Sequence, residues 1–230
     1  MKIDSKFYYF HFCLPLVIFI CLIGLIELTR FDLTLADWLF KWEGGAWNLR
    51  GDFFFSDLIH VGGGLFFRGF ILILITLWIM SLWVERLKPY KRPLLYIAII
   101  IPVSVGLMTN VGKWLTHTDC PWDLIRYGGE RPYLALFEAH SGQYRFGKCF
   151  PAGHASIGYA LVALYFFFAE IAPRYKFYGL GTGIAVGLLF GISQQIRGAH
   201  FISHDLWTMS LCWFISISWY LLLFRNKAQN

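Results

Sequence analysis

Six long stretches of the chain contain no Asp, Glu, Lys or Arg, and they constrain the fold more than any other feature. They cover residues 7–26, 69–84, 93–112, 149–169, 177–196 and 206–224. A bilayer core of about 30 Å is crossed by about 20 apolar residues in a helix. The stretch 69–84 is short, and we expect it to extend back to about Leu65, with Arg68 reaching the interface. The pattern predicts an all-α, polytopic membrane protein with six transmembrane helices.

The composition excludes a soluble fold. Hydrophobic residues make up 57% of the 230 residues, and charged residues make up 15%. An ordinary soluble domain has roughly 45–50% apolar and about 25% charged residues. A soluble protein of this size would leave large apolar patches exposed. The net charge of +6 is spread along the chain rather than gathered in one block, so we expect no nucleic-acid partner.

The basic residues predict how the chain crosses the membrane. Six spans place both termini on one side, and the short segments on that side carry ten basic residues: Lys2, Lys6, Arg86, Lys88, Lys91, Arg92, Arg174, Lys176, Arg225 and Lys227. The positive-inside rule places this side in the cytoplasm. The loops 29–66, 113–150 and 197–205 then face outward. We therefore expect a multi-pass protein of a bacterial inner membrane, with these loops in the periplasm.

The first outer loop contains an aromatic segment at residues 31–55, with eight Phe and Trp side chains. Aromatic rings favour the headgroup layer of a membrane. The segment is therefore predicted to lie at the interface. It would serve either as an entrance for lipid headgroups or as an aromatic belt without a specific role.

Three polar segments stand at the predicted outer ends of the spans and form the candidate site. Lys113 follows the third span, Pro-Ala-Gly-His at 151–154 opens the fourth, and residues 197–205 join the fifth to the sixth. A helix start that contains glycine exposes backbone N–H groups and lets an anion come close. Lys113 and Arg197 add cationic ligands for phosphate oxygens. The pattern predicts a phosphate-binding site.

Two histidines in these segments supply the chemistry. His154 and His200 can divide the roles of general acid and nucleophile, and the carboxylate of Asp205 can orient one imidazole. Such a set performs phosphoryl transfer without a metal. We therefore expect no metal and no cofactor.

In order and spacing these motifs resemble those of the type 2 phosphatidic acid phosphatases, also called lipid phosphate phosphatases. That six-span family carries Lys-x6-Arg-Pro, then Pro-Ser-Gly-His, then Ser-Arg-x5-His-x3-Asp. Here Lys113 stands in the first motif, 151–154 in the second, and Ser193 with His200 in the third. The resemblance covers about residues 93–224, which we expect to be the phosphatase-like core of a single domain over 1–230.

Four positions depart from the family pattern: Cys120 for Arg, Ala152 for Ser, Gln194 for Arg and His204 for Asp. Asp205 follows one residue after the family's Asp position. Arg197 lies three residues before His200, so the two share a helix face. We expect Arg197 to replace the missing third-motif arginine.

The resemblance implies an integral membrane phosphatase that works through a phosphohistidine. His200 would attack phosphorus, and His154 would protonate the leaving oxygen. The phosphate oxygens would be held by Lys113, Gly153, Arg197, Ala152 and Gln194. Asp205 would orient His200, with His204 as the alternative. The substrate would be a membrane lipid phosphate or pyrophosphate of the lipid A, undecaprenyl pyrophosphate or phosphatidylglycerol phosphate type.

Three other functions remain open at this point. A lipid-to-lipid phosphotransferase would differ only in the acceptor. A catalytically degenerate lipid-binding or transport protein would account for the two missing family arginines. A metalloenzyme would use His200 and His204, spaced i, i+4 as in zinc sites, with Asp205 or His154 as a third ligand. The metal site is disfavoured because the neighbouring Lys113 and Arg197 would repel a cation.

The outer loop 113–150 adds four further cations and two cysteines. The cations are Arg126, Arg131, Arg145 and Lys148, which are placed either to contact a headgroup or to form a solvated loop surface. Cys120 and Cys149 are the two cysteines of this outward loop, whereas Cys13, Cys21 and Cys212 fall within spans. In an oxidising compartment we predict a disulfide between them. It would pin the first motif against the turn at 151–154.

Overall fold

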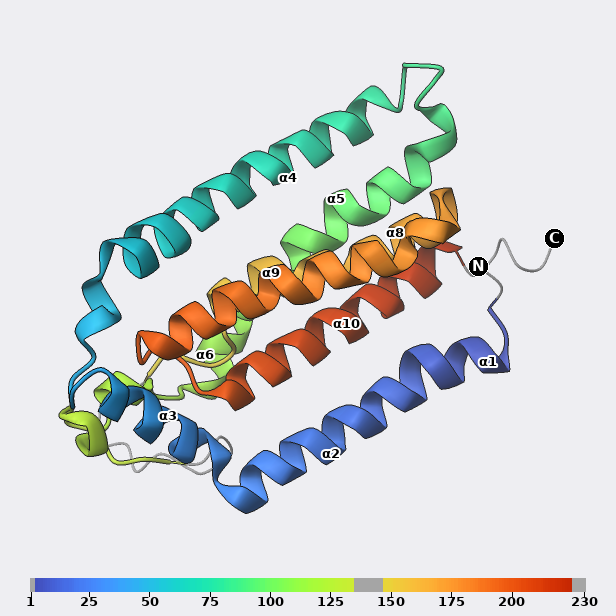
Figure 1. Cartoon of the computed structure of the whole chain (residues 1–230). Helices are drawn as coiled ribbons and strands as arrows, with labels where there is room; N and C mark the ends of the chain where they lie inside the picture. The colour runs from blue at the N-terminus through green and yellow to red at the C-terminus, as the bar shows by residue number, and fades with distance from the viewer. Residues whose placement is uncertain (1–2, 135–146, 225–230) are drawn as a thin grey trace.

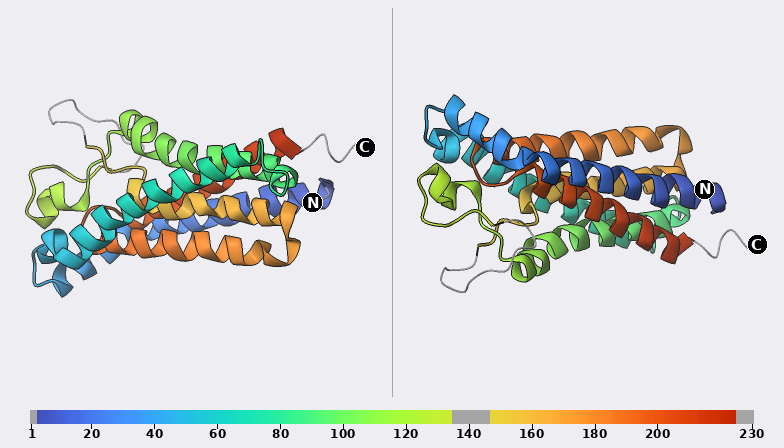
Figure 2. Two further views of the ribbon diagram at one scale, coloured as in Figure 1. Left: turned by 90° about the horizontal axis from the view of Figure 1, so that it is seen from above. Right: turned by 90° about the horizontal axis from the view of Figure 1, so that it is seen from below.

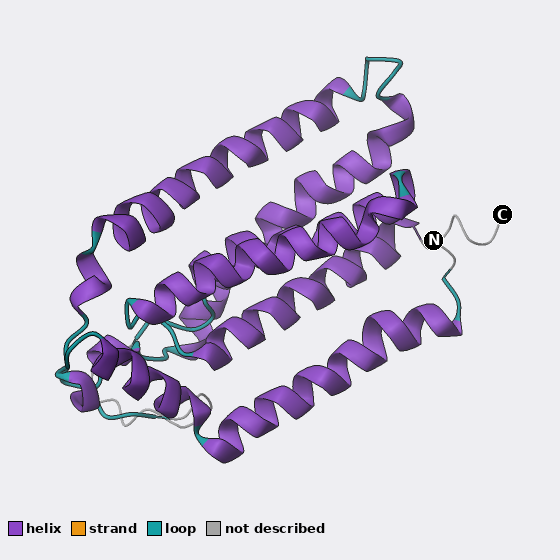
Figure 3. Cartoon of the chain, viewed as in Figure 1, coloured by secondary structure: helices purple, strands orange, loops and turns teal. Residues whose placement is uncertain are grey.

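The computed structural model describes residues 3–134 and 147–224. These residues form helices joined by loops, and they contain no strand (Figure 3). Six helical segments among them are long and apolar enough to cross a membrane: Ser5–Thr29, Phe53–Met80, Lys88–Asp123, Gly153–Ile171, Pro173–Ile196 and Ile202–Phe224. The predicted all-α protein with six membrane spans is confirmed.

Most spans are built from several helical elements in succession. The α-helices are α1 (Ser5–Tyr8), α2 (Leu14–Thr29), α3 (Phe31–Trp42), α4 (Gly63–Met80), α5 (Lys91–Gly106), α6 (Lys113–Thr116), α7 (Gly153–Tyr159), α8 (Ala163–Ile171), α9 (Lys176–Ile196) and α10 (Ile202–Phe224). Wider, π-helical turns form η1 (Tyr9–Cys13), η3 (Phe53–Gly62) and η5 (Leu107–Gly112). Tighter 3₁₀ turns form η2 (Asn48–Gly51), η4 (Lys88–Tyr90), η6 (Pro121–Asp123), η7 (Ile125–Tyr127), η8 (Ala160–Val162) and η9 (Pro173–Tyr175).

The buried core lies among α5, α7, α8, α9 and α10, and α2 and α4 flank it on opposite sides (Figures 1 and 2). Ile100 and Ile101 of α5 are fully buried, and the rings of Phe166 and Tyr220 stack with centroids 5.0 Å apart. Apolar side chains also cover the outer faces. Leu72 of α4, for example, is 65% exposed. Exposed apolar faces are expected where helices contact acyl chains rather than water.

Glycines let α7 and α9 approach closely. A Cβ added to Gly158 of α7 would overlap the backbone of Gly187 in α9, and a Cβ on Gly187 would overlap the ring of Tyr159. Small residues at a helix interface allow this close approach inside a membrane. The contact fixes the start of α7, with His154, relative to the end of α9, with Arg197.

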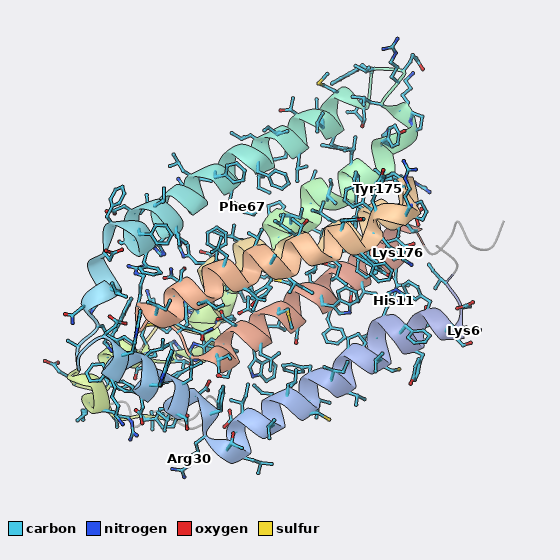
Figure 4. All side chains as sticks on the ribbon, in the orientation of Figure 1. Lys6, His11, Arg30, Phe67, Tyr175 and Lys176 are labelled. Atoms are coloured by element: carbon cyan, nitrogen blue, oxygen red, sulfur yellow. A yellow bond between two sulfur atoms is a disulfide. The ribbon has the colours of Figure 1, made fainter. Side chains whose placement is uncertain are left out.

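The two ends of the bundle differ. α1 and the last turn of α10 lie at one end, here called the terminus end (Figure 1). α3, α6 and the segments 117–134, 147–152 and 197–201 lie at the other, here called the loop end. Lys6 and Lys176 lie at the terminus end and Arg30 at the loop end (Figure 4). Of the basic residues used above, Lys2, Arg225 and Lys227 lie outside the described residues.

The second span begins earlier than predicted. We expected 69–84 with an extension to Leu65, but the helical segment runs from Phe53 to Met80. Asp52 starts it, because its Oδ1 accepts hydrogen bonds from the backbone N–H groups of Phe54 (2.9 Å) and Phe55 (3.3 Å). The charge-free stretch began after Arg68, and the expected extension reached only Leu65. The helix continues back through His60 and Asp57, so Arg68 lies inside the span rather than at its start.

Candidate active site

The three polar segments converge at the loop end, around Lys113, His154, Arg197 and His200. Lys113 and His154 both lie close enough to His200 to act on it electrostatically. Lys113 and Arg197 act in the same way on His154. Residues more than 80 positions apart in the chain therefore share one site, as the sequence predicted.

Lys113 covers the start of α7. A methyl group added to Gly153 would lie 3.4 Å from Lys113 Nζ and 3.1 Å from Thr109 Cγ2. A side chain at position 153 would therefore require Thr109 or Lys113 to shift away from the start of α7. Lys148 lies near Lys113 as well, so the local field is strongly positive and suits an anion.

Ala152 was predicted among the phosphate ligands, and its backbone N–H has a partner within the protein. Its backbone N–H donates a hydrogen bond of 2.9 Å to Thr208 Oγ1 of α10. The amide is therefore already used, and it anchors the turn before α7 to the last span. The Gly153 amide, one residue later, remains the candidate at this helix start.

Arg197 is held in place by polar groups of two elements. Its Nη1 donates to Oε1 of Gln194 (3.0 Å), and its Nε donates to the backbone oxygen of Arg50 (2.9 Å). Burial lowers the pKa of Arg197, Arg50 lowers it further and Asp57 raises it. Gln194 is fully buried and faces Arg197. The pair therefore acts together, with Gln194 supporting the guanidinium.

The turn between α9 and α10 depends on a glycine. Gly198 has a φ of +67°, which side-chain-bearing residues rarely adopt. A Cβ there would also overlap the ring of Trp47. Arg197 lies just before this glycine and His200 lies two residues after it, so the turn places both residues at the site.

His200 is buried and its neighbour is His204. The two Nδ1 atoms lie 3.4 Å apart, so one ring carries a proton there and donates it to the other. Burial lowers the pKa of His200 well below its usual value. His204, Lys113 and His154 lower it further, while a backbone hydrogen bond with Cys149 opposes the shift. The ring is therefore neutral near pH 7.

Asp205 was the preferred orienting residue for His200, and the geometry favours His204 instead. The carboxylate of Asp205 accepts a hydrogen bond from Nε2 of Gln195 and lies against Gly191 of α9. Successive residues of a helix turn by about 100°. The one-residue offset from the family spacing therefore points Asp205 towards α9 rather than towards His200.

His60, which lies on η3 of the second span, was not among the predicted site residues. Its ring stacks on that of His154, with centroids 3.5 Å apart and planes at 21°. Nε2 of His154 lies 3.1 Å from the His60 carbonyl oxygen and donates to it. The search for charge-free stretches left His60 in a loop. The glycine run at 62–64 just after it was the only local signal of a close approach.

Asp32 of α3 was also missed, and it ties the first loop to the site. Its carboxylate accepts hydrogen bonds from the backbone N–H (2.9 Å) and the hydroxyl (2.5 Å) of Ser203. Burial raises the pKa of Asp32, and the two bonds from Ser203 oppose that rise. The aromatic segment predicted at the interface therefore includes a helix that is bonded to the turn carrying His200.

Two of the four loop cations have carboxylate partners. Arg126 donates through Nε (2.7 Å) and Nη2 (2.5 Å) to Asp37, and these bonds lower the pKa of that carboxyl. Arg131 forms an ion pair with Asp119. Arg145 lies outside the described residues. The first pair ties the loop to α3, and the second joins two positions within the loop.

The predicted disulfide between Cys120 and Cys149 is present, with the Cα atoms 5.2 Å apart. Hydrogen bonds reinforce it: the backbone N–H of Cys149 donates to Thr118 O (2.9 Å), and Thr116 Oγ1 donates to Phe150 O (2.7 Å). The segment after Lys113 is therefore fastened to the turn before α7. Asp123 lies beside the two sulfur atoms, but both thiols are consumed by the bond, which leaves one carboxylate as a possible metal ligand there.

The arrangement can bind a phosphate group and transfer it. Lys113, Arg197 and the Gly153 amide supply positive charge and donors. A neutral imidazole at His200 supplies a nucleophile, and His154 supplies a second imidazole for proton transfer. Charges placed in advance around a phosphate stabilise the charge that develops during its transfer.

Comparison with known proteins identifies one family. The sequence model of the PAP2 superfamily matches residues 92–228, more than half of the chain, and the match contains Lys113, His154 and His200. It covers nearly the same range as the core predicted at 93–224. No curated protein and no solved structure matches the chain.

Proposed function

Because this multi-pass membrane protein belongs to the PAP2 superfamily, we propose that it is a lipid phosphatase that removes a phosphate from a membrane lipid phosphate or lipid pyrophosphate. The observation that carries the proposal is the convergence of Lys113, His154, Arg197 and His200 at one end of a six-span bundle. Lipids of the lipid A, undecaprenyl pyrophosphate and phosphatidylglycerol phosphate type carry such groups at the membrane surface.

His200 is the proposed nucleophile. Its Nδ1 faces His204, so Nε2 is the nitrogen free to attack. The new bond joins Nε2 to phosphorus, and the bond from phosphorus to the lipid oxygen breaks with its electron pair on that oxygen. Lys113, Arg197 and the Gly153 amide balance the charge on the other phosphate oxygens.

His154 is the proposed acid and then base. In its acid form the His154 ring carries a proton on both nitrogens. The N–H at Nε2 stays hydrogen-bonded to the His60 carbonyl, and the proton at Nδ1 goes to the leaving oxygen. A water molecule then returns a proton to His154 while its oxygen attacks the phosphohistidine. The bond from Nε2 to phosphorus breaks and inorganic phosphate leaves. These steps use no metal.

We infer from the basic residues which side of the membrane the site faces. The described segments at the terminus end carry Lys6, Lys176 and the group at 86–92. The positive-inside rule supports a cytoplasmic terminus end and, in a bacterial inner membrane, a periplasmic site.

Phosphate release by the purified protein tests the proposal. Mixed micelles would present each candidate lipid in turn, with and without a chelator, and a second lipid would be present as a phosphate acceptor. We expect phosphate release that survives the chelator and is abolished in His200→Gln. The matched control is His11→Gln, the same change near the terminus end (Figure 4). Absence of phosphate release from every candidate, or full activity in His200→Gln, would refute the proposal, and phosphate appearing only on the second lipid would make the protein a phosphotransferase.

A further inference from the structure

His60 reaches the site from outside the part of the chain that the family match covers. It lies on η3, in the second span, whereas the match begins at residue 92. Its ring is half-buried and lies within electrostatic reach of Lys113, Arg197 and His154. None of the three family motifs includes a residue of this span. A role for His60 would therefore be an addition specific to this chain's second span.

Two contacts with His60 fix the imidazole of His154. The ring stack at 3.5 Å sets the plane of the His154 ring. The His60 carbonyl, which can only accept, holds the proton of His154 on Nε2. In a histidine, the bond made by one ring nitrogen decides the state of the other. Nδ1 of His154 is therefore the nitrogen that is left for the substrate.

Contacts with α9 and Arg197 fix the backbone segment that carries His60. Residues Phe53–Gly62 form π-helical turns, which are rare and occur often at functional sites. Gly63 follows directly, and a Cβ there would overlap the ring of Phe190 in α9. Asp57, on the same segment, faces Arg197. These contacts dock the segment against α9 and bring His60 over α7.

We propose that His60 is a positioning residue for His154: it fixes the plane of the ring and keeps Nε2 protonated, so that Nδ1 is the nitrogen that takes up a second proton and gives it to the leaving oxygen. The inference rests on the proposed phosphatase function. A flat ring at position 60 is sufficient for the stack, while the carbonyl belongs to the backbone and survives any substitution.

Leaving-group dependence separates this role from a merely structural one. General acid help matters most when the leaving group is poor. We expect His60→Ala to lower kcat for an alkyl phosphate about 10–100-fold. The loss for p-nitrophenyl phosphate, which has a good leaving group, should be less than about threefold, and KM should change little for both. His60→Phe keeps the stacked ring and should recover most of the alkyl phosphate activity.

The matched control is His11→Ala with His11→Phe. His11 also stacks on an aromatic ring, that of Phe7 at 4.4 Å, but lies near the terminus end (Figure 4). Both control variants should treat the two substrates alike. Equal losses for the two substrates in His60→Ala would overturn the inference. So would a raised KM in His60→Phe with no recovery, because that result would make His60 a direct phosphate ligand.

A spectroscopic measurement keeps the inference testable without turnover. In protein with ¹⁵N-labelled histidine, the His154 signal should show the neutral ring with its proton on Nε2 in the wild type and in His60→Phe. In His60→Ala the proton should stay on Nε2, because the backbone carbonyl of residue 60 remains, but the ring signals should shift and broaden once the stacked ring is gone. A wild-type protein that shows this signal but releases no phosphate would refute the proposed function and leave the positioning role standing. A signal unchanged by His60→Ala would refute the positioning role alone.

Discussion

The imidazole of His200 is buried among cations, and both conditions favour its neutral form. Lys113 adds positive charge nearby, so a proton on His200 is disfavoured both by burial and by charge. The same surroundings attract a phosphate and keep its attacker unprotonated. One feature of the sequence, cations grouped around a histidine, therefore serves binding and nucleophilicity together.

The lowered pKa of His200 predicts how stability changes with pH. In the unfolded chain the ring takes up a proton near pH 6.5, whereas the folded protein resists this. The stability that comes from the neutral ring is complete above about pH 6.5 and is lost as the pH falls towards the lower folded pKa. We expect melting temperatures in detergent to fall between pH 7 and 5, and to fall less in His200→Gln. An equal acid sensitivity in both proteins would contradict this assignment.

Arg197 and Gln194 should contribute unequally. Arg197 carries the charge, and its guanidinium donates one hydrogen bond to the amide oxygen of Gln194. Arg197→Ala should lower kcat/KM about 10²–10³-fold, as expected for loss of a donor that stabilises developing charge. Gln194→Ala should cost about tenfold or less. Steady-state kinetics of the two variants checks the ranking, and the reverse order would assign the phosphate contact to Gln194.

His204 and Asp205 are distinguished in the same way. His204→Ala removes the partner of His200 Nδ1 and should lower kcat about 10²-fold. Asp205→Asn keeps an acceptor oxygen for Gln195 and should retain activity within about threefold. Single-turnover rates of phosphate release compare the two. Loss of activity in Asp205→Asn with little change in His204→Ala would restore Asp205 as the orienting residue.

Most site residues could be read from the sequence because their spacing along the chain is local. Lys113, 151–154 and 197–200 each stand at a span end, and span ends meet at one face of the membrane. His60 and Asp32 could not be found in this way. Their roles arise from a stacked ring and a cap between distant segments, and neither leaves a periodic or spaced signal.

At the level of elements, α3 works as a brace for the last span. Asp32 on its buried face caps the start of α10 through Ser203. Its opposite face exposes large apolar rings such as Trp38, which is 60% exposed. A helix with one face bonded to the protein and one apolar face outward suits the membrane interface. The sequence predicted the aromatic outer face, but the cap depends on the fold.

The disulfide joins two elements of the site, and its removal should be measurable. Cys120 and Cys149 close a loop of 29 residues in sequence separation. On the loop-entropy account this stabilises the protein by about 3–4 kcal/mol. We expect the double variant Cys120→Ser/Cys149→Ser to melt at a lower temperature and to lose phosphatase activity, since Lys113 and the 151–154 turn are no longer fastened. A reducing agent should lower the melting temperature of the wild type and leave the double variant unchanged.

An unchanged wild-type melting temperature under reducing conditions would contradict the stabilising role of this bond. The prediction of the disulfide succeeded because, of the five cysteines, only Cys120 and Cys149 lie in the outward loop 113–150. The second span was predicted less well, because its expected start was Leu65 and the helical segment begins at Phe53. Asp57 and Arg68 interrupt its apolar pattern, and a search for charge-free stretches counts such residues against a helix.

Over the whole molecule, the architecture follows from hydrophobicity and the site from topology. Apolar length alone predicted six spans, and an even number of spans places α1 and the last turn of α10 together at the end opposite the site (Figure 1). Glycines on α7 and α9 then bring the second and third motifs into contact. Packing of this kind depends on shape across two helices, and for that reason the distances within the site could not be predicted from the sequence.

Above all, we expect His200 to take up the phosphoryl group from a membrane lipid. Incubation of the purified protein with a lipid carrying ³²P-phosphate, followed by rapid alkaline quench and peptide mass spectrometry, tests it directly. We predict an acid-labile, alkali-stable label on the peptide containing His200 in the wild type, accumulation of that label in His154→Ala with a pyrophosphate substrate, and no label in His200→Gln. Label on any other residue, or phosphate release by His200→Gln at the wild-type rate, would contradict the account.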